Sequence, residues 1–178
     1  MGWFSKAVPE RKWPEVSADL GLKLKAASGS WYSTFQHGTA SRSFALPPNA
    51  ISATANRYIH MMQLAAVAAT LQENSYVSDL MFFLELVYIH LTDGPPANLH
   101  RDIEALPFAL AGDAQKSLIL WSQSMASELL PGKDDPVLLE ELNRYGSLLV
   151  VQAKIATCQA CGDHKGAEKI RSSFGDKA

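Results

Sequence analysis

Hydrophobic residues recur at helical spacing along most of this 178-residue chain. Near its start, Pro14 can begin a helix, and Val16, Leu20 and Leu24 then follow on one face. Gly29 comes directly after this periodic stretch, where a glycine commonly closes a helix. The pattern therefore predicts that the first helix ends at this glycine.

The next stretch, residues 28–48, lacks a helical period and is rich in hydroxyl and aromatic side chains. Trp31, Ser33 and Phe35 alternate with other residues, and His37-Gly38 could form a turn, so a short hairpin or an irregular excursion is expected. Long irregular segments are uncommon in compact domains and often carry function. The aromatic content of this segment makes disorder an unsuitable explanation.

Proline, glycine and capping residues divide the rest of the chain into further helices. Ser75, Asp113 and Asp135 stand where helix N-caps are expected, and Gly162 where a C-cap is expected. The predicted helices cover residues 49–73, 76–92, 98–106, 114–130, 136–161 and 164–174. We therefore expect one all-α domain over residues 1–178, a bundle of six or seven helices preceded by an arm over residues 1–13.

The charge balance excludes some classes of partner. The chain has 16 basic and 18 acidic residues, a net charge of −2, and 47% hydrophobic residues. No basic patch is available for nucleic acid, so no nucleic-acid partner is expected. Sparse and nearly balanced charge leaves little repulsion between copies, which favours a homo-oligomer.

The expected location is the cytoplasm. The beginning of the chain lacks the apolar core of a signal peptide, because charged residues and a proline interrupt it. The longest strongly apolar run, residues 58–72, is shorter than the roughly 20 residues that cross a bilayer, so no membrane partner is expected. Two cysteines in the whole chain suit a reducing compartment.

Both cysteines lie at the end of the longest predicted helix, in the run Cys158-Gln-Ala-Cys161-Gly-Asp-His164. Redox pairs of this spacing place the reactive cysteine at a helix N-terminus, where the dipole stabilises the thiolate, whereas this pair lies at a C-terminus. A structural zinc ion needs four ligands, and this turn offers three good ones at most, unless a distant histidine completes the set. We therefore expect no metal and no cofactor, and two cysteines that pack as small apolar residues.

The same stretch, ACGDHKGAEKI, resembles the turn of a tetratricopeptide-type helical hairpin. Gly162-Asp163 stands at the bend, and Ala167 is a small residue that can pack closely. The resemblance covers this hairpin only, since Arg171 stands where that repeat prefers a large apolar residue. Such repeats need several copies to bury their faces, and the chain shows no second copy.

The second predicted helix carries an unusual stripe of polar residues. Its members recur at helical spacing without a Lys or a Glu: Asn49, Ser52, Asn56, His60, Gln63, Thr70 and Asn74. Uncharged polar groups suit partly buried contacts, because their hydrogen bonds can be satisfied without desolvating an ion. The stripe is expected to line a ligand pocket or a subunit interface, with an ordinary exposed face as the alternative.

The third predicted helix is apolar on nearly every side, as central helices are, and yet it contains Glu85. This carboxylate is expected to be substantially buried, or else to reach the edge of the protein or pair with an arginine such as Arg57. Buried carboxylates have raised pKa values that suit acid–base chemistry. Tyr88 follows one turn later on the same face.

Two functions from different classes remain open. The first is a helical protein-interaction protein that binds another protein or itself through an aromatic segment or polar stripe. The residues that would carry it are Trp31, Tyr32, His37, Arg42, Asn56, His60 and Gln63, since Trp, Tyr and Arg commonly anchor interfaces. The second is a small-molecule-binding module or enzyme with a pocket between the second and third helices, using His60, Glu85 and Tyr88. No catalytic residue is assigned, since the sequence has no nucleophile elbow, phosphate-binding loop or zinc-protease motif.

Overall fold

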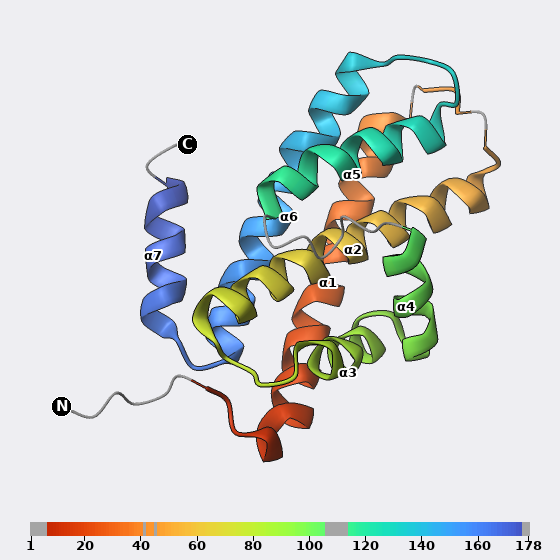
Figure 1. Ribbon diagram of the computed structural model, residues 1–178. Helices are drawn as coiled ribbons and strands as arrows, with labels where there is room; N and C mark the ends of the chain where they lie inside the picture. The colour runs from red at the N-terminus through yellow and green to blue at the C-terminus, as the bar shows by residue number, and fades with distance from the viewer. Residues whose placement is uncertain (1–6, 41, 45, 106–113, 176–178) are drawn as a thin grey trace.

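The computed structural model describes residues 7–40, 42–44, 46–105 and 114–175. Within them a 3-10 turn, η1 (Glu10–Lys12), leads into α-helices, and no described residue lies in a β-strand. The helices are α1 (Trp13–Thr39), α2 (Pro48–Asn74), α3 (Leu80–Thr92), α4 (Pro96–Ala105), α5 (Ala114–Leu129), α6 (Pro136–Ala160) and α7 (His164–Gly175). The predicted all-α helical bundle is confirmed (Figure 1).

The first helix is longer than predicted. α1 runs unbroken through Gly29 and on to Thr39, so the expected end at Gly29 and the expected turn at His37-Gly38 are both wrong. A Cβ at Gly29 would meet nothing within 4 Å, which places this glycine on an open face of the helix. An exposed glycine inside a helix costs only about 1 kcal/mol relative to alanine, so the surrounding packing can carry the helix across it.

The expected excursion over residues 28–48 shrinks to the connection over residues 40–47. Trp31 and Phe35, taken above as alternating strand positions, lie one turn apart on the buried face of α1. A spacing of four residues fits both a strand period of two and a helix period of 3.6, so these positions could not distinguish the two structures.

α2 is the central helix of the bundle, a place that the apolar pattern had assigned to the third helix. Every residue from Met61 to Leu71 is buried, and α2 packs against α1, α3, α5 and α6. α3 instead lies at the surface and exposes Phe82 and Ile89. Among the described helices, none combines the length and the apolar character needed to cross a membrane.

α1 and α3 pack against each other along most of α3. Their contacts follow in the same order along both helices. Trp13 meets the edge of Phe83 with ring centroids 5.9 Å apart, and Gly21 meets His90 about two helical turns later. At Gly21 the two helices approach closely, which the absence of a side chain permits.

Aspartates cap α3 and α6. Asp135 caps α6, accepting a hydrogen bond of 2.8 Å from the backbone N–H of Leu138, which confirms the predicted start of this helix. α3 is capped by Asp79 and not by Ser75, which instead adopts a left-handed conformation at the end of α2 (φ 50°). The predicted cap Asp113 lies outside the described residues.

The hairpin predicted at the end of the chain is present. Gly162 has φ +79° between α6 and α7, a conformation that favours glycine, and Ala167 is buried against α6. α7 packs mainly on α6 and stands at the edge of the bundle (Figure 1).

The expected arm over residues 1–13 is shorter than predicted. Val8 is already buried, and its backbone N–H donates to the Tyr76 carbonyl oxygen at 2.7 Å. The indole N–H of Trp13 donates to the Val8 carbonyl oxygen at 2.9 Å. From Val8 onward, therefore, the chain is held by the junction between α2 and α3.

Candidate functional site

The predicted aromatic anchors do not form an exposed patch. Trp31 is buried, and its ring stacks on Phe35 with centroids 5.4 Å apart. Tyr32 is half-buried, and its hydroxyl is hydrogen-bonded to the Ser52 hydroxyl on α2. Only His37 is exposed, with Nδ1 2.7 Å from the carbonyl oxygen of residue 33 on its own helix. The continuation of α1 turns Trp31 into the core, so this residue is not an exposed anchor, whereas an interface on the other residues stays a prediction.

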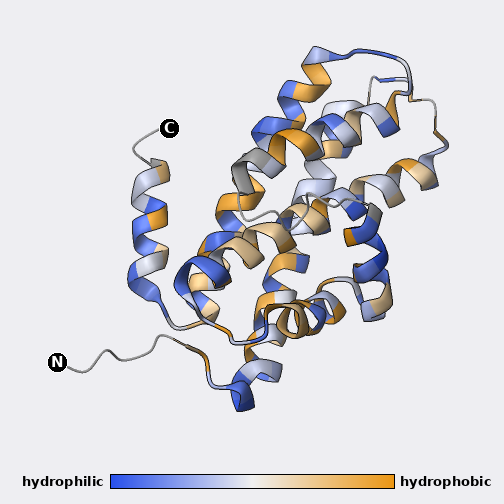
Figure 2. Cartoon of the chain, in the orientation of Figure 1, coloured by the Kyte–Doolittle hydropathy of each residue, from blue (hydrophilic) through white to orange (hydrophobic). Residues whose placement is uncertain are grey.

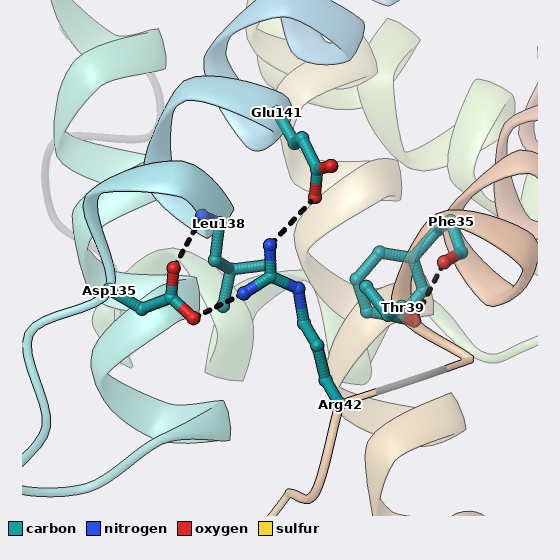
Figure 3. A network of polar contacts seen from close by, with 6 residues as sticks. All are labelled: Phe35, Thr39, Arg42, Asp135, Leu138 and Glu141. Atoms are coloured by element: carbon teal, nitrogen blue, oxygen red, sulfur yellow. Dashed lines mark hydrogen bonds and ion pairs between the residues drawn. The ribbon is translucent and has the colours of Figure 1, made fainter.

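Arg42 connects two distant parts of the chain (Figure 3). Its guanidinium forms ion pairs with the carboxylates of Asp135 and Glu141, the latter at 3.3 Å. Asp135 uses its other oxygen to cap α6. The side chain of Arg42 is only 18% exposed, so its donors point into this network and away from a partner. Through these ion pairs, Arg42 links the connection between α1 and α2 to the start of α6.

The central part of the polar stripe on α2 is covered by the chain itself. Gln63 is fully buried, and its Nε2 donates to the Leu24 carbonyl oxygen on α1 at 2.8 Å. Thr70 is buried as well and bonds within α2, whereas Asn56 and His60 are half-buried. At its centre, therefore, the stripe is buried within the chain, with Gln63 in a contact between α1 and α2, and a subunit interface or ligand pocket on the rest of the stripe stays a prediction.

His60 is neutral at physiological pH. Burial lowers the pKa of its imidazole to about 4, and the positive charge of Lys25 on α1 adds to this effect. A neutral imidazole carries no charge toward a ligand.

Glu85 is less buried than predicted. Its side chain is 27% exposed, and its carboxylate pairs with His100 Nε2 at 2.7 Å, across the gap between α3 and α4. Arg57, the alternative partner considered above, pairs with Glu128 on α5. α3 is more exposed to solvent than its apolar composition indicated, because it lies at the surface of the bundle.

Tyr88 faces α4 from the buried side of α3. Burial raises the pKa of its hydroxyl, and the negative charge of Asp102 adds to the rise. Burial likewise raises the pKa of Asp102, against the lowering influence of Arg101 and then Arg57. Glu85 and Tyr88 thus both lie against α4, whereas His60 lies near Lys25 of α1, and a pocket that uses all three stays a prediction.

The cysteine turn is held by Tyr76, which lies in the connection between α2 and α3. The buried Tyr76 hydroxyl donates to Asp163 Oδ2 at 2.6 Å and lies 3.8 Å from Cys158 Sγ. Burial raises the pKa of the Cys161 thiol to about 12, with Cys158 and Asp163 adding to the rise, so this thiol is protonated at neutral pH. His164 is exposed. Among the residues that the structure describes, no group of three or more His, Cys, Asp or Glu side chains is placed to hold a metal ion.

A groove of about 430 Å³ lies between α5, α6, α7 and the end of α2. Its apolar lining comes from three helices: Leu118, Val150, Val151, Cys158, Ile170 and Phe174. Lys154, Lys169 and Glu73 stand among its charged lining residues. Its volume falls in the range of roughly 300–1,000 Å³ that is usual for binding sites. An apolar centre with a charged border is the common anatomy of a protein interface.

The groove exists because the apolar stripe of α7 is only partly covered. Ala167, Ile170 and Phe174 recur at helical spacing, yet only Ala167 is fully buried, and the other two remain half-buried. The rest of α7 is polar, as Figure 2 shows by the blue segments along this helix. An amphipathic helix normally buries its whole apolar face against another element. The uncovered part of this stripe is the apolar wall that α7 offers to a ligand.

Sequence reasoning missed this groove, although one signal for it was present. Ala167, Ile170 and Phe174 follow the spacing of an apolar face, in a helix short enough to lie at the edge of a bundle. Whether other helices cover this face depends on the packing of segments that are distant in the sequence. His60, Glu85 and Tyr88 do not line the groove.

No family model, curated protein or solved structure matches this chain. The tetratricopeptide-type resemblance is therefore limited to the shape of the turn between α6 and α7.

Proposed function

We propose that this protein is a helical interaction domain that binds an apolar segment of a partner protein in the groove between α6 and α7. The observation that carries the proposal is the half-covered stripe of α7, on which Ile170 and Phe174 face the groove. Large apolar side chains that line a hollow at a protein surface commonly mark interaction sites.

The lining of the groove indicates which kind of segment would fit. Val150, Val151 and Leu118 offer an apolar floor to two or three side chains from one face of a helix or from an extended peptide. Lys154 and Lys169 supply positive charge beside that floor. A partner segment with acidic residues beside its apolar anchors is electrostatically complementary to this border.

Self-association is part of the proposal. The net charge of −2 gives little repulsion, and several large apolar side chains are exposed, among them Phe82, Ile89, Ile119, Leu120 and Leu148. A stable dimer is expected to bury more than roughly 1,000 Å² in total. Light scattering over a wide concentration range should give a mass above 19.4 kDa, the mass of one chain. A constant single-chain mass would contradict this part alone.

The proposed location is the cytoplasm. A chain with two cysteines, of which the Cys161 thiol is protonated at neutral pH, suits a reducing compartment.

The binding proposal can be tested by selecting peptides from a random display library on the intact protein. Selected peptides should carry apolar residues at i, i+3 and i+4 or i+7, flanked by acidic residues. Val151→Glu puts a charge on the groove floor and should weaken their binding at least tenfold, and Phe174→Ala should weaken it less. Val137→Glu is the matched control, because Val137 is 58% exposed on the same helix and does not line the groove.

Circular dichroism of each variant separates a binding defect from loss of the fold. Peptides whose affinity does not distinguish Val151→Glu from Val137→Glu would place any binding surface elsewhere and overturn the proposal. A library that yields no binder would overturn it as well.

A further inference from the structure

We infer that one face of α6 binds the same face of a second copy of this chain, with the two helices antiparallel across a two-fold axis. The inference rests on the self-association that is part of the proposed function, and it names the surface and the arrangement. The residues of this surface, called the α6 face below, are Val137, Glu140, Glu141, Arg144 and Leu148. They recur at intervals of three and four residues, so they lie along one side of the helix.

The α6 face points away from the core. The opposite side of the helix supplies its buried residues, among them Leu142, Gly146 and Ala153. Val137 and Leu148, by contrast, are 58% and 41% exposed. Single exposed apolar residues are normal on a protein surface, so these two become informative only through the charges that lie between them.

Those charges are not neutralised within the chain. Glu140 and Arg144 are exposed, and neither forms an ion pair with any residue that the structure describes. Arg144 instead lies over the ring of Tyr145, with its guanidinium carbon 6.0 Å from the ring centroid. Glu141 is 36% exposed and contacts Arg42 at 3.3 Å. The α6 face therefore presents acidic groups followed by a basic group to a partner.

One antiparallel register places complementary residues of two copies opposite each other. The midpoint between Val137 and Leu148 along the helix is also the midpoint between Glu141 and Arg144. When two copies of α6 run antiparallel about this point, each Val137 meets Leu148 of the second copy, and each Glu141 meets Arg144 of the second copy. Glu140, one residue before Glu141, can reach the same arginine. Two-fold symmetry makes each of these contacts twice.

A parallel pair of helices would instead bring like charges together. Arg144 would then lie against Arg144 of the second copy, and Glu140 against Glu140, which is unfavourable. The charges thus select the antiparallel orientation, and Val137 and Leu148 supply apolar contact on either side of them. The contact from Val137 to Leu148 spans roughly 17 Å of helix. A contact of this length suits a weak dimer, with a dissociation constant in the micromolar range.

Variants with complementary charges test the inference by analytical ultracentrifugation of the full chain. Arg144→Glu leaves only acidic groups at the centre of the α6 face and should weaken dimerisation at least about tenfold. Glu140→Arg should weaken it less, because Glu141 still faces Arg144. An equimolar mixture of these two variants restores opposite charges. It should form a dimer at concentrations at which each variant alone sediments as a single chain of 19.4 kDa.

Lys165→Glu is the matched control for Arg144→Glu. It makes the same change of charge at an exposed position of α7, away from the α6 face, and should leave the dimer intact. Leu148→Ser tests the apolar contact and should weaken the dimer without changing any charge. All the substituted residues are exposed, and circular dichroism of each variant verifies that the fold is retained.

Three results would overturn the inference. The first is a wild-type chain that sediments as a single chain up to roughly 500 μM, well above a micromolar dissociation constant. The second is a dimer that Arg144→Glu leaves intact, since a parallel pair or a different interface would then be present. The third is a mixture of Arg144→Glu and Glu140→Arg that dimerises no more tightly than either variant alone.

The failure of this inference is distinguishable from the failure of the proposed function. A dimer that is insensitive to Arg144→Glu would leave self-association standing and move it to another surface. Neither Arg144 nor Leu148 lines the groove beside α7, so peptide binding can be measured on the Arg144→Glu chain, without the dimer. Peptides whose binding to that chain depends on Val151 would support the groove whether or not the α6 faces pair.

Discussion

Gly21 of α1 lies directly against His90 of α3. A Cβ at Gly21 would fall 2.5 Å from the His90 Cβ and 2.9 Å from the carbonyl oxygen of Val87. The second of these atoms belongs to the backbone, so it cannot rotate away as a flexible side chain can. The crossing of α1 and α3 therefore requires a residue without a side chain at position 21.

Substituting Gly21→Ala is expected to destabilise the protein. The added methyl group must push the two helices apart, and overpacking of this kind typically costs about 1–3 kcal/mol, more than the gain of up to about 1 kcal/mol in helix propensity. Gly29→Ala is the matched control in the same helix, where nothing lies within 4 Å. That substitution should raise the free energy of unfolding by about 0.5–1 kcal/mol.

Urea unfolding followed by circular dichroism measures both changes. The prediction requires effects of opposite sign from the same substitution at two positions of one helix. A stabilising Gly21→Ala would show that α3 can move away freely and that the close crossing is unimportant.

These two glycines show what could be predicted from sequence and what could not. Local signals predicted the helical class, the start of α6 at Asp135-Pro136 and the hairpin turn at Gly162, because each depends on residues within one or two turns. They misplaced the end of α1, because a glycine that ends a helix and a glycine that lets another helix approach look alike in sequence. Only the packing of α3 distinguishes Gly21 from Gly29.

The candidate site was harder to predict for the same reason. Burial of Trp31 and Gln63 follows from which helices cover α1 and α2, and the sequence pattern placed α3, not α2, at the centre. Once α2 takes the centre, its polar stripe becomes an internal contact and Glu85 comes to the surface. The groove beside α7 exists because the other helices leave Ile170 partly uncovered. No local sequence pattern specifies this.

Arg42 is expected to stabilise the fold more than an ordinary surface charge. Arg42→Met would leave the carboxylates of Asp135 and Glu141, which are 25% and 36% exposed, without their cation. The expected loss is about 1–2 kcal/mol, below the cost of breaking a fully buried pair because water partly screens these groups. Lys23→Met is the control, since its pair with Asp19 is about half exposed and worth roughly 0.5 kcal/mol or less.

The measurement for Arg42 is again the midpoint and slope of urea unfolding, repeated at high salt. Added salt should reduce the difference between wild type and Arg42→Met only in part, because partly buried pairs are screened less than exposed ones. Equal losses for the Arg42 and Lys23 variants would contradict a fastening role for Arg42.

His60 should make stability depend on pH in the acidic range. Its pKa is about 4 in the folded protein and 6.5 as the ordinary value, so between these values the unfolded chain binds more protons than the folded protein. The stability that the folded protein gains from a neutral His60 is therefore fully present above pH 6.5. It is lost as the pH falls toward 4. The total loss is at most about 3 kcal/mol, because each pKa unit corresponds to about 1.4 kcal/mol.

The variant His60→Gln removes this titration and keeps a neutral polar side chain. The difference in unfolding free energy between wild type and variant should be constant above pH 7 and should change in favour of the variant as the pH falls from 6.5. Carboxylates titrate equally in both proteins, so the difference isolates the imidazole. A difference that does not vary between pH 7 and pH 4.5 would contradict the burial of a neutral His60.

The last prediction concerns Tyr76, which joins the start of the described chain to the turn between α6 and α7. Burial raises the pKa of its hydroxyl, and the hydrogen bond to Asp163 adds to this, so the hydroxyl stays a donor at neutral pH. Tyr76→Phe would leave a buried carboxylate oxygen without this donor, and a hydrogen bond to a charged group is worth about 1.5–3 kcal/mol. Tyr145→Phe is the control, because the described residues offer its half-buried hydroxyl no hydrogen bond, and the expected change is within about 0.5 kcal/mol. Hydrogen exchange should localise the effect of Tyr76→Phe to the first turns of α7, which Asp163 caps through Gly166. If both phenylalanine variants lose the same stability, or if exchange in α7 is unchanged, then the Tyr76 hydroxyl does not hold this turn, and α7 is positioned by its packing on α6 alone.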